Sequence, residues 1–435
     1  MQSFFWWAVF APIVRRAVGC STAIVDCGDG YPTVTLRTLD WDSQVFYQAG
    51  GMQFVPPNSQ NEASLNQPTK LGYAKQYFQV PKTTDTLAID GMNEQGLSCA
   101  ILQNSLSISI PSSPGDKEQV NALDFCSYIL GKYATVSEVE QALANGDFDL
   151  STTVPSDLSA EQLEVLTKAL GAAATQVDEN TMAYQFHWFI SDGAKEGLYL
   201  TGKCNISQNQ NCTGDGIGYE TRYARALTND ALTEDFVLGV DETYGADWAN
   251  TVPYNSDSRN RFARLHFALK DCQQFMYPNS SNLQYGEWSP TYGTDDESKN
   301  PTADVYSALK RGENILNSIV LPRSGFNTES ESTQASFLKV PDVGLYYYAS
   351  PADDGWQEID LKKLSKAGKQ VEFQIFTPGS FGTEARVLNA DLSTGGQSSS
   401  TGGQPTATST PPASGVIPAA GFGVALALAV AGMFV

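Results

Sequence analysis

The sequence predicts an α+β fold, in which strands and helices occur in separate blocks. Apolar residues make up 41% of the 435 residues, which is enough for a large packed core. Short runs rich in β-branched and aromatic residues indicate strands, and these runs come in groups. Longer stretches with helical apolar spacing lie between the groups. Grouped strands and grouped helices favour α+β layers over a strict alternation of strand and helix.

Six short apolar runs predict strands. Between the first two lies a turn formed by Gly28, Asp29 and Gly30, so we expect these two strands to form a hairpin. The predicted strands are Thr22–Val25, Thr33–Leu36, Leu97–Leu102, Gln185–Ile190, Leu198–Thr201 and Val371–Phe376.

Four stretches show helical periodicity: Gln119–Tyr133, Ser137–Asn145, Ala160–Leu170 and Ser258–Leu269. Ser137 followed by Glu140 is interpreted as a capping box at the start of the second helix. The segment from Asp149 to Thr181 has no evident chemical role and is interpreted as an inserted helical excursion.

Charge and histidine content exclude several functions. The formal net charge of -21 repels phosphates, so nucleic acid is not an expected partner. The two histidines, His187 and His266, have apolar and aromatic neighbours and are interpreted as core residues. So little histidine argues against Ser-His-Asp, papain-like Cys-His and histidine-zinc sites. We expect no cofactor and no metal.

The chain contains seven cysteines, and an odd number in a secreted protein predicts one free thiol. If Cys20 is the free residue, the other six allow fifteen disulfide patterns. Cys204 and Cys212 flank a short polar segment and are the first choice for a local bridge.

The N-terminal segment 1–19 is predicted to be a signal peptide. An apolar run over residues 4–14 is too short to span a bilayer. Small residues, Ala17 and Gly19, stand three and one positions before Cys20, as at a signal cleavage site. Cleavage there would make Cys20 the first residue. The basic pair Arg15 and Arg16 follows the apolar run instead of preceding it, which is atypical.

Three further parts follow the signal peptide. Residues 20–389 form one continuous body, and residues 390–415 form a stalk rich in Ser, Thr, Gly and Pro. Residues 416–435 are apolar to the end and predict a GPI-anchor signal, with a transmembrane tail as the alternative. With three glycosylation sequons, at Asn205, Asn211 and Asn279, this predicts a secreted protein on the outer cell face. The membrane would be contacted only through the anchor.

The chemistry centres on Cys20. The predicted hairpin folds Arg37 and Asp40 back toward this residue. Positive charge nearby lowers the pKa of a thiol and favours the reactive thiolate. An N-terminal α-amine has a reference pKa of about 7.7 to 8.0 and can take a proton near neutrality. One residue could therefore supply both the nucleophile and the base, without histidine.

Three motifs in order carry a family resemblance: the cysteine at the mature N-terminus, Arg37-Thr-Leu-Asp40-Trp41, and the segment Asp90-Gly-Met-Asn-Glu-Gln-Gly-Leu97. Together they resemble the choloylglycine hydrolase family, which includes penicillin V acylases and bile salt hydrolases. The resemblance implies an N-terminal-nucleophile (Ntn) hydrolase, an αββα sandwich of two stacked antiparallel sheets flanked by helices. The segment beginning at Asp90 is interpreted as a turn rather than as catalytic.

The resemblance also implies roles for individual residues. Cys20 matches the nucleophile, Arg37 the arginine beside it and Asp40 the aspartate that contacts the α-amine. Asn229 resembles the asparagine that donates to the oxyanion, and Arg261 resembles a later active-site arginine. Where the family has asparagine or tyrosine in the oxyanion hole, this chain has Gln103, with its neighbour Asn104 as the alternative donor.

The implied activity is hydrolysis of a linear N-acyl amide through a thioester on Cys20, with a small-molecule substrate and a homo-oligomeric assembly. Trp41, Phe46 and Tyr47 could line an acyl pocket, or could equally belong to the core. The alternative function is a catalytically inactive surface module that binds ligands and keeps the fold. Gln103 and the atypical signal peptide are its support.

Overall fold

The computed structural model describes residues 19–27, 31–41, 50–60, 68–79, 86–104, 107–109, 117–151, 174–176, 182–205, 218–230, 232–255, 257–270, 303–321, 332–349 and 356–373. Several predictions concern residues outside these ranges. They are the signal peptide apart from Gly19, the stalk 390–415, the tail 416–435, the helix at Ala160–Leu170, and the side chains of Trp41, Phe46 and Tyr47.

Two large antiparallel sheets form the centre of the described structure. The first, called sheet A, has the strand order β16-β1-β2-β17-β18-β19. Its strands are β16 (Ala226–Leu227), β1 (Cys20–Val25), β2 (Val34–Trp41), β17 (Ser332–Val340), β18 (Leu345–Ala349) and β19 (Gln357–Asp360). The predicted hairpin is confirmed, because β1 pairs with β2 from Cys20 opposite Leu39 to Val25 opposite Val34.

The second, sheet B, has eight strands in the order β15-β13-β12-β6-β5-β4-β3-β20. They are β15 (Tyr219–Ala224), β13 (Gly197–Gly202), β12 (Phe186–Ser191), β6 (Ser98–Gln103), β5 (Thr86–Asn93), β4 (Tyr73–Gln79), β3 (Gly50–Val55) and β20 (Val371–Phe373). Smaller pairs are β7 (Ser107–Ile108) with β14 (Cys204–Asn205), β8 (Glu118–Asn121) with β9 (Phe148–Ser151), and β10 (Ala174–Gln176) with β11 (Met182–Tyr184).

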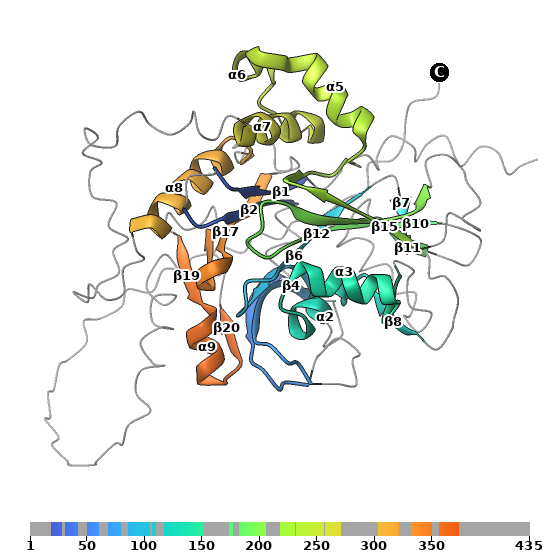
Figure 1. Ribbon diagram of the computed structural model, residues 1–435, viewed down its shortest axis with the longest axis vertical. Coiled ribbons are helices and arrows are strands. Elements are labelled where there is room, and N and C mark those ends of the chain that lie inside the picture. The colour runs from blue at the N-terminus through green and yellow to red at the C-terminus, as the bar shows by residue number, and fades with distance from the viewer. Residues whose placement is uncertain are drawn as a thin grey trace, which may run out of the picture. The chain divides into compact units, whose positions relative to one another are not determined.

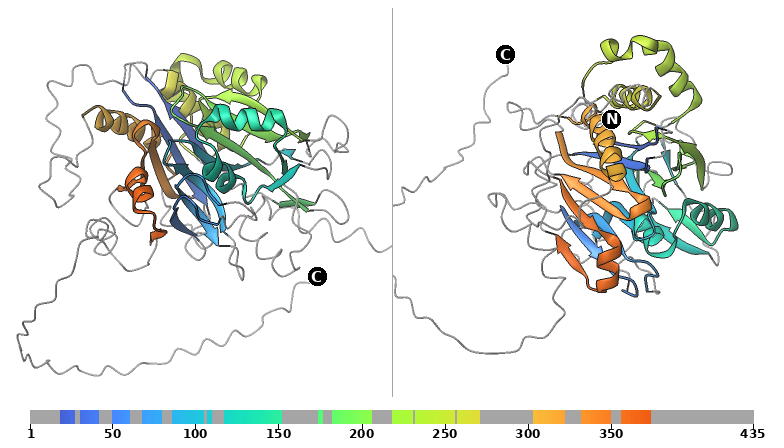
Figure 2. Two further views of the ribbon diagram at one scale, coloured as in Figure 1. Left: turned by 60° about the horizontal axis from the view of Figure 1, so that its bottom comes forward. Right: turned by 60° about the vertical axis from the view of Figure 1, so that its left-hand side comes forward.

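Helices cover the outer face of each sheet, as Figures 1 and 2 show. On sheet A lie α7 (Ser258–Lys270) and α8 (Ala303–Asn317), with α5 (Glu234–Tyr244) and α6 (Trp248–Thr251) beside α7. On sheet B lies α2 (Phe125–Lys132), followed by α3 (Val136–Asn145), while α9 (Leu361–Ala367) follows β19. The predicted αββα sandwich is therefore confirmed. Within the described ranges no helix combines the length and apolar character needed to cross a membrane.

Strand alternation divides sheet A into two chemically different faces. Val34, Leu36, Leu338 and Val340 point outward into an apolar core shared with α7 and α8. The residues that alternate with these on the same strands, Thr35, Arg37 and Lys339, point inward, toward sheet B. The space between the sheets thus holds buried polar and charged groups, while much of the apolar core lies under the helices.

The structure corrects where several predicted helical segments begin. Residues 118–121 form β8, so the helix predicted at Gln119–Tyr133 begins only at Phe125. Pairing with β9 overrides the local helical pattern, and β9 also contradicts a helical start for the excursion beginning at Asp149. The N-cap of α3 is Thr135 rather than Ser137, and its side chain accepts from Glu138 N. The capping pair is Thr135 with Glu138, two residues earlier than predicted, and Glu138 Oε2 accepts from the N–H of Ala134, one residue before the N-cap.

Among the described residues Cys20 is the free cysteine, as predicted. Cys99 on β6 is bonded to Cys126 on α2, which ties sheet B to its covering helix. Cys27 and Cys204 also belong to disulfides. The predicted bridge from Cys204 involves Cys212, which lies outside the described residues.

Candidate active site

Cys20 is the first residue of β1, and its side chain points into the space between the sheets. The residue is 1% exposed. Its main-chain nitrogen donates to Oδ1 of Asn229 at 2.7 Å. Its sulfur lies 3.8 Å from Nη2 of Arg37. The thiol and the main-chain nitrogen of one residue therefore each have a separate polar partner.

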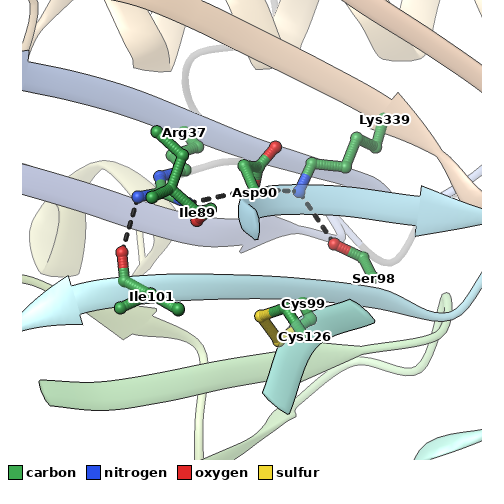
Figure 3. Close-up of a disulfide and its surroundings, with 8 residues drawn as sticks. All are labelled: Arg37, Ile89, Asp90, Ser98, Cys99, Ile101, Cys126 and Lys339. Carbon is green, nitrogen blue, oxygen red and sulfur yellow. Dashed lines mark hydrogen bonds and ion pairs between the residues drawn. A yellow bond between two sulfur atoms is a disulfide. The ribbon is translucent and has the colours of Figure 1, made fainter. Parts of the chain in front are cut away.

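Arg37 reaches across from β2 into a gap in sheet B. A bulge on β5 leaves Ile89 without a partner on β4, because Gln76 pairs with Asp90 and Tyr77 pairs with Ala88. The pairing of β5 with β6 runs from Met92 to Asp90. Beyond this point the carbonyls of Ile89 and Ile101 accept from the guanidinium instead, the latter at 2.6 Å (Figure 3). Arg37 thus satisfies two buried carbonyls and fixes its own position.

The spacing of three residues between Arg37 and Asp40 has a structural reason. On a strand it places the two side chains on opposite faces, so Asp40 points outward from sheet A toward α7. The carboxylate accepts from Thr38 Oγ1 at 3.2 Å and from Thr333 Oγ1 at 2.6 Å, and it lies 3.6 Å from Arg261 Nη1. A bulge on β17 accompanies the pairing of Thr333 with Asp40.

Asn229 and Arg261 complete the surroundings of Cys20. Asn229 follows β16, which pairs with β1, and Arg261 comes from α7. Arg261 Nη1 donates to the carbonyl of Cys20 at 2.6 Å and also to Ser21 Oγ, while Nη2 donates to Asn229 Oδ1 at 2.8 Å. Asn229 is therefore oriented by both its neighbours, and its Nδ2 points to the carbonyl of Gln103 at 3.2 Å.

Gln103 and Asn104 contribute different groups. The carbonyl of Gln103 faces Asn229, and in an antiparallel strand the N–H of the same residue points to the same side. The main chain of Asn104 faces the other way and donates to Gln185 O. Its side chain donates to Thr201 Oγ1 at 3.0 Å. The main-chain N–H of Gln103 thus points toward the Cys20 and Asn229 side, while the side-chain amide of Asn104 is bonded to Thr201.

Gly19 occupies the position next to the main-chain nitrogen of Cys20. Its carbonyl accepts from Asp40 N at 2.8 Å. A Cβ at this position would lie 3.1 Å from Asp40 Cβ and 3.2 Å from Arg261 Nη2. Glycine is thus the residue that this crowded position accommodates without displacing either partner.

The electrostatics of the thiol favour a separate base. Burial raises the pKa of Cys20, although Arg37 and Arg261 act in the opposite direction. Burial opposes the charge of Arg37, but Asp90 and Cys20 outweigh this effect and raise its pKa. Burial also raises the pKa of Asp40, against the effect of Arg261. The thiol therefore keeps its proton near neutrality unless a base removes it.

Comparisons with known proteins find similarity to one family of hydrolases. The sequence model described as linear amide C-N hydrolases, choloylglycine hydrolase family, matches residues 21–203. Over these residues the chain is similar to members of this family. The bile salt hydrolase/transferase of Clostridium perfringens (strain 13 / Type A) is 22% identical over 296 residues, which are 65% of this chain and 75% of that protein. These similarities support a hydrolase that acts on a linear amide C–N bond.

Solved structures show the same fold at low sequence identity. Penicillin V acylase from Agrobacterium tumefaciens has a TM-score of 0.54 and 17% identity, covering 81% of this chain and 91% of that one. A cysteine-to-alanine mutant of conjugated bile acid hydrolase from Clostridium perfringens has the same TM-score and identity, with 82% and 96% covered. These likenesses concern the fold alone.

The structure brings together Cys20, Arg37, Asp40, Asn229 and Arg261, with Gln103 adjacent through its main chain. Sequence reasoning on the choloylglycine hydrolase pattern missed other members of the cluster. The turn prediction for the segment beginning at Asp90 is wrong for its first half, because residues 90–93 belong to β5 and the turn comes at residues 94–96, where Asn93 Oδ1 accepts from Leu97 N. Asp90 itself is fully buried and bonded to Arg37, Lys339 and Tyr346. The sequence feature that could have indicated this buried group is the single lysine within the apolar run Phe337-Leu338-Lys339-Val340.

His187 lies outside the group of contacts around Cys20. Its burial leads us to predict that the stability of the fold depends on pH. The residue is fully buried on β12, and burial lowers its pKa to about 3. The unfolded chain binds a proton here below about pH 6.5, whereas the folded chain does not. Stability from this residue is therefore present above pH 6.5 and is lost as the pH falls toward 3.

We expect the free energy of unfolding to fall by about 1.4 kcal/mol per pH unit in that window. Urea denaturation of the wild type and His187→Leu at a series of pH values measures this, and the difference between their slopes isolates the residue. His266→Gln is the control, because His266 is partly exposed beside Asp241. Equal slopes for wild type and His187→Leu would contradict the assignment.

Proposed function

We propose that the protein hydrolyses a linear N-acyl amide, with Cys20 as its N-terminal nucleophile after removal of residues 1–19. The observation that carries this proposal is the pair of contacts at Cys20, sulfur to Arg37 and nitrogen to Asn229. Cleavage of the bond between Gly19 and Cys20 would turn that nitrogen into an α-amine. The space next to it, now filled by Gly19, lies against the Asp40 carboxylate, which would then orient the amine.

The reaction follows from these positions. The α-amine takes the proton from the thiol, and the sulfur forms a bond to the amide carbonyl carbon. Asn229 Nδ2 and the Gln103 main-chain N–H donate to the oxyanion. When the C–N bond breaks, the leaving nitrogen takes the proton from the α-ammonium group. Water then attacks the thioester carbonyl carbon while the amine takes a proton from it. The C–S bond breaks, the α-ammonium group returns the proton to the sulfur, and the acid is released.

The substrate class is an amide with an apolar acyl group. A bile salt hydrolase/transferase and a penicillin V acylase are among the similar proteins. Phenoxyacetyl amides and bile-salt conjugates are therefore suitable probes, together with N-acyl amino acids and N-acyl homoserine lactones. Amine release from each probe, measured by mass spectrometry with mature protein, tests the proposal. A preparation that begins at Cys20 and releases no amine from any class would favour the inactive binding module.

The oxyanion donors can be separated by substitution. Asn229→Leu removes a side-chain donor and is expected to lower kcat by about 10²–10³. Gln103→Leu keeps the main-chain N–H and is expected to change kcat by less than about tenfold, as is Asn104→Leu. Steady-state kinetics on the preferred amide measures all three. A loss of about a hundred-fold in Gln103→Leu would mean that its side chain is the donor.

Secretion and surface anchoring form the second part of the proposal. The apolar run before Cys20 and the small residues at 17 and 19 support export. The Cys99–Cys126 disulfide supports an oxidising compartment. The polar segment 390–415 and the apolar end 416–435 support a GPI anchor. Release of the protein from cells by a phosphatidylinositol-specific phospholipase tests the anchor, and retention after treatment would favour a transmembrane tail.

A further inference from the structure

A second group of buried charges lies behind Arg37, on the side away from the Cys20 sulfur. Asp90 is fully buried on β5, and both of its oxygens are bonded to residues of sheet A. Oδ1 accepts from Lys339 Nζ at 2.6 Å and lies 3.2 Å from Arg37 Nη1 (Figure 3). Oδ2 accepts from the hydroxyl of Tyr346 at 2.6 Å. One carboxylate therefore forms ion pairs with two cations, Arg37 and Lys339.

The guanidinium of Arg37 connects this group to the nucleophile. Nη1 faces Asp90 and Nη2 faces the Cys20 sulfur, so the two ends of one planar group contact an anion and a thiol. An anion paired with Arg37 alone would cancel much of the positive field that Arg37 exerts on the sulfur. Such cancellation would make the thiolate harder to form.

Lys339 changes this balance. It contacts the same oxygen of Asp90 at the shorter distance, and it also donates to Ser98 Oγ at 2.8 Å. Its side chain is fully buried, so its charge is removed from bulk solvent. Within the group joined by these ion pairs, the buried charges are Arg37, Arg261 and Lys339 against Asp40 and Asp90, three cations and two carboxylates. The side-chain charges of this group balance when the Cys20 sulfur carries a negative charge.

We propose that Lys339 is a positioning residue that neutralises Asp90, so that Asp90 holds Arg37 in place without cancelling the charge Arg37 presents to Cys20. This inference deepens the proposed function and rests on it. Lys339 touches neither Cys20 nor its neighbours Asn229 and Arg261 in the described contacts, so it acts through Asp90 and Arg37. The charged or titratable groups that face Cys20 and Arg37 are Asp40, Asp90, Arg261, Lys339 and Tyr346.

The test is a double-mutant cycle read out on the thiol itself. The midpoint of Cys20 ionisation is measured from thiolate ultraviolet absorbance against pH, with Cys20→Ser as the blank. Lys339→Met leaves Asp90 charged beside Arg37, so we expect the midpoint to rise by about one pH unit. Adding Asp90→Asn removes that charge, so we expect the double variant to return to within about 0.3 unit of the wild type.

A purely structural role predicts the opposite of this rescue, because the double variant loses more buried contacts than the single one. An unchanged midpoint in Lys339→Met, or a double variant shifted further than Lys339→Met, would overturn the proposal. If Lys339→Met does not fold, the double variant alone tests the proposal. A Cys20 midpoint in the double variant one pH unit above that of the wild type would contradict neutralisation of Asp90 by Lys339. The pair Lys195 and Asp26 is the matched control, because Lys195 is largely exposed. Lys195→Met, alone or with Asp26→Asn, should leave the midpoint unchanged.

The titration needs no amide substrate and does not depend on which amide is cleaved. A failed rescue with intact amide turnover would refute the role of Lys339 and leave the proposed function standing. A successful rescue in a protein that turns over no amide would support the role of Lys339 and refute the proposed function. Recording kcat/KM against pH for any amide that is cleaved adds a second readout, and its limbs should move with the thiol midpoint.

Discussion

Replacing Cys20 with serine is expected to lower kcat/KM for the preferred N-acyl amide by more than about a thousand-fold. A hydroxyl holds its proton more tightly than a thiol, so the weak base at the N-terminus cannot activate it. The geometry around the residue would change little, because oxygen and sulfur occupy similar positions and the main-chain bond to Asn229 remains. Binding of substrate should therefore survive while turnover is lost.

Initial-rate kinetics and substrate binding by calorimetry measure these two effects separately. Thr22→Ser is the matched control, because Thr22 is two residues along the same strand and its hydroxyl donates to Leu36 O, a bond that serine can keep. Its kinetics should equal those of the wild type. Turnover by Cys20→Ser within tenfold of the wild type would remove Cys20 from the chemistry.

Replacing Arg37 with methionine is expected to be costly for both activity and stability. The variant loses the cation beside the sulfur and leaves the carbonyls of Ile89 and Ile101 without their donor. We expect kcat/KM to fall by about 10²–10³. We also expect the free energy of unfolding to fall by about 3–5 kcal/mol, as when one partner of a buried ion pair is removed.

Kinetics and urea denaturation test this second prediction. Arg37→Lys keeps the charge, but its single ammonium group cannot reach both carbonyls as the planar fork does, so its losses should be intermediate. Arg259→Met is the control, because Arg259 is an exposed arginine that bonds Gly239 O and Thr243 Oγ1 on the surface. An Arg37→Met protein with wild-type activity would mean that the thiol does not need this cation.

Local sequence information was enough to predict the hairpin of β1 and β2 and the place of Arg37 and Asp40 on it. The glycines at 28 and 30 predicted a hairpin, and the pairing of β1 with β2 confirms it. This pairing and the alternation of β2 set the relation between Cys20, Arg37 and Asp40, which lie within 21 positions of one another. The turn predicted for Asp90–Leu97 occupies only residues 94–96, because residues 90–93 belong to β5, and Gly91 on that strand has a packing reason. A Cβ on Gly91 would lie 2.6 Å from Ala74 O and 2.7 Å from Leu130 Cδ1.

Contacts between distant segments could not be predicted from local patterns. The pairing of β17 with β2 brings Phe337 opposite Arg37 and places Lys339 where it meets Asp90. Periodicity predicted α7 but missed α8, whose apolar residues pack on Val34 and Leu36 in a shared core. Periodicity also assigned β8 to a helix, because its parallel partner β9 lies beyond α3 in the sequence.

The most direct measurement is peptide mass spectrometry of the protein, quenched in acid while it turns over its preferred amide. If the account is correct, the first peptide begins at Cys20 and a fraction of it carries the mass of the acyl group on that residue. A chain that still contains Gly19 ahead of Cys20 during turnover, or an acyl group found on another residue, would contradict it.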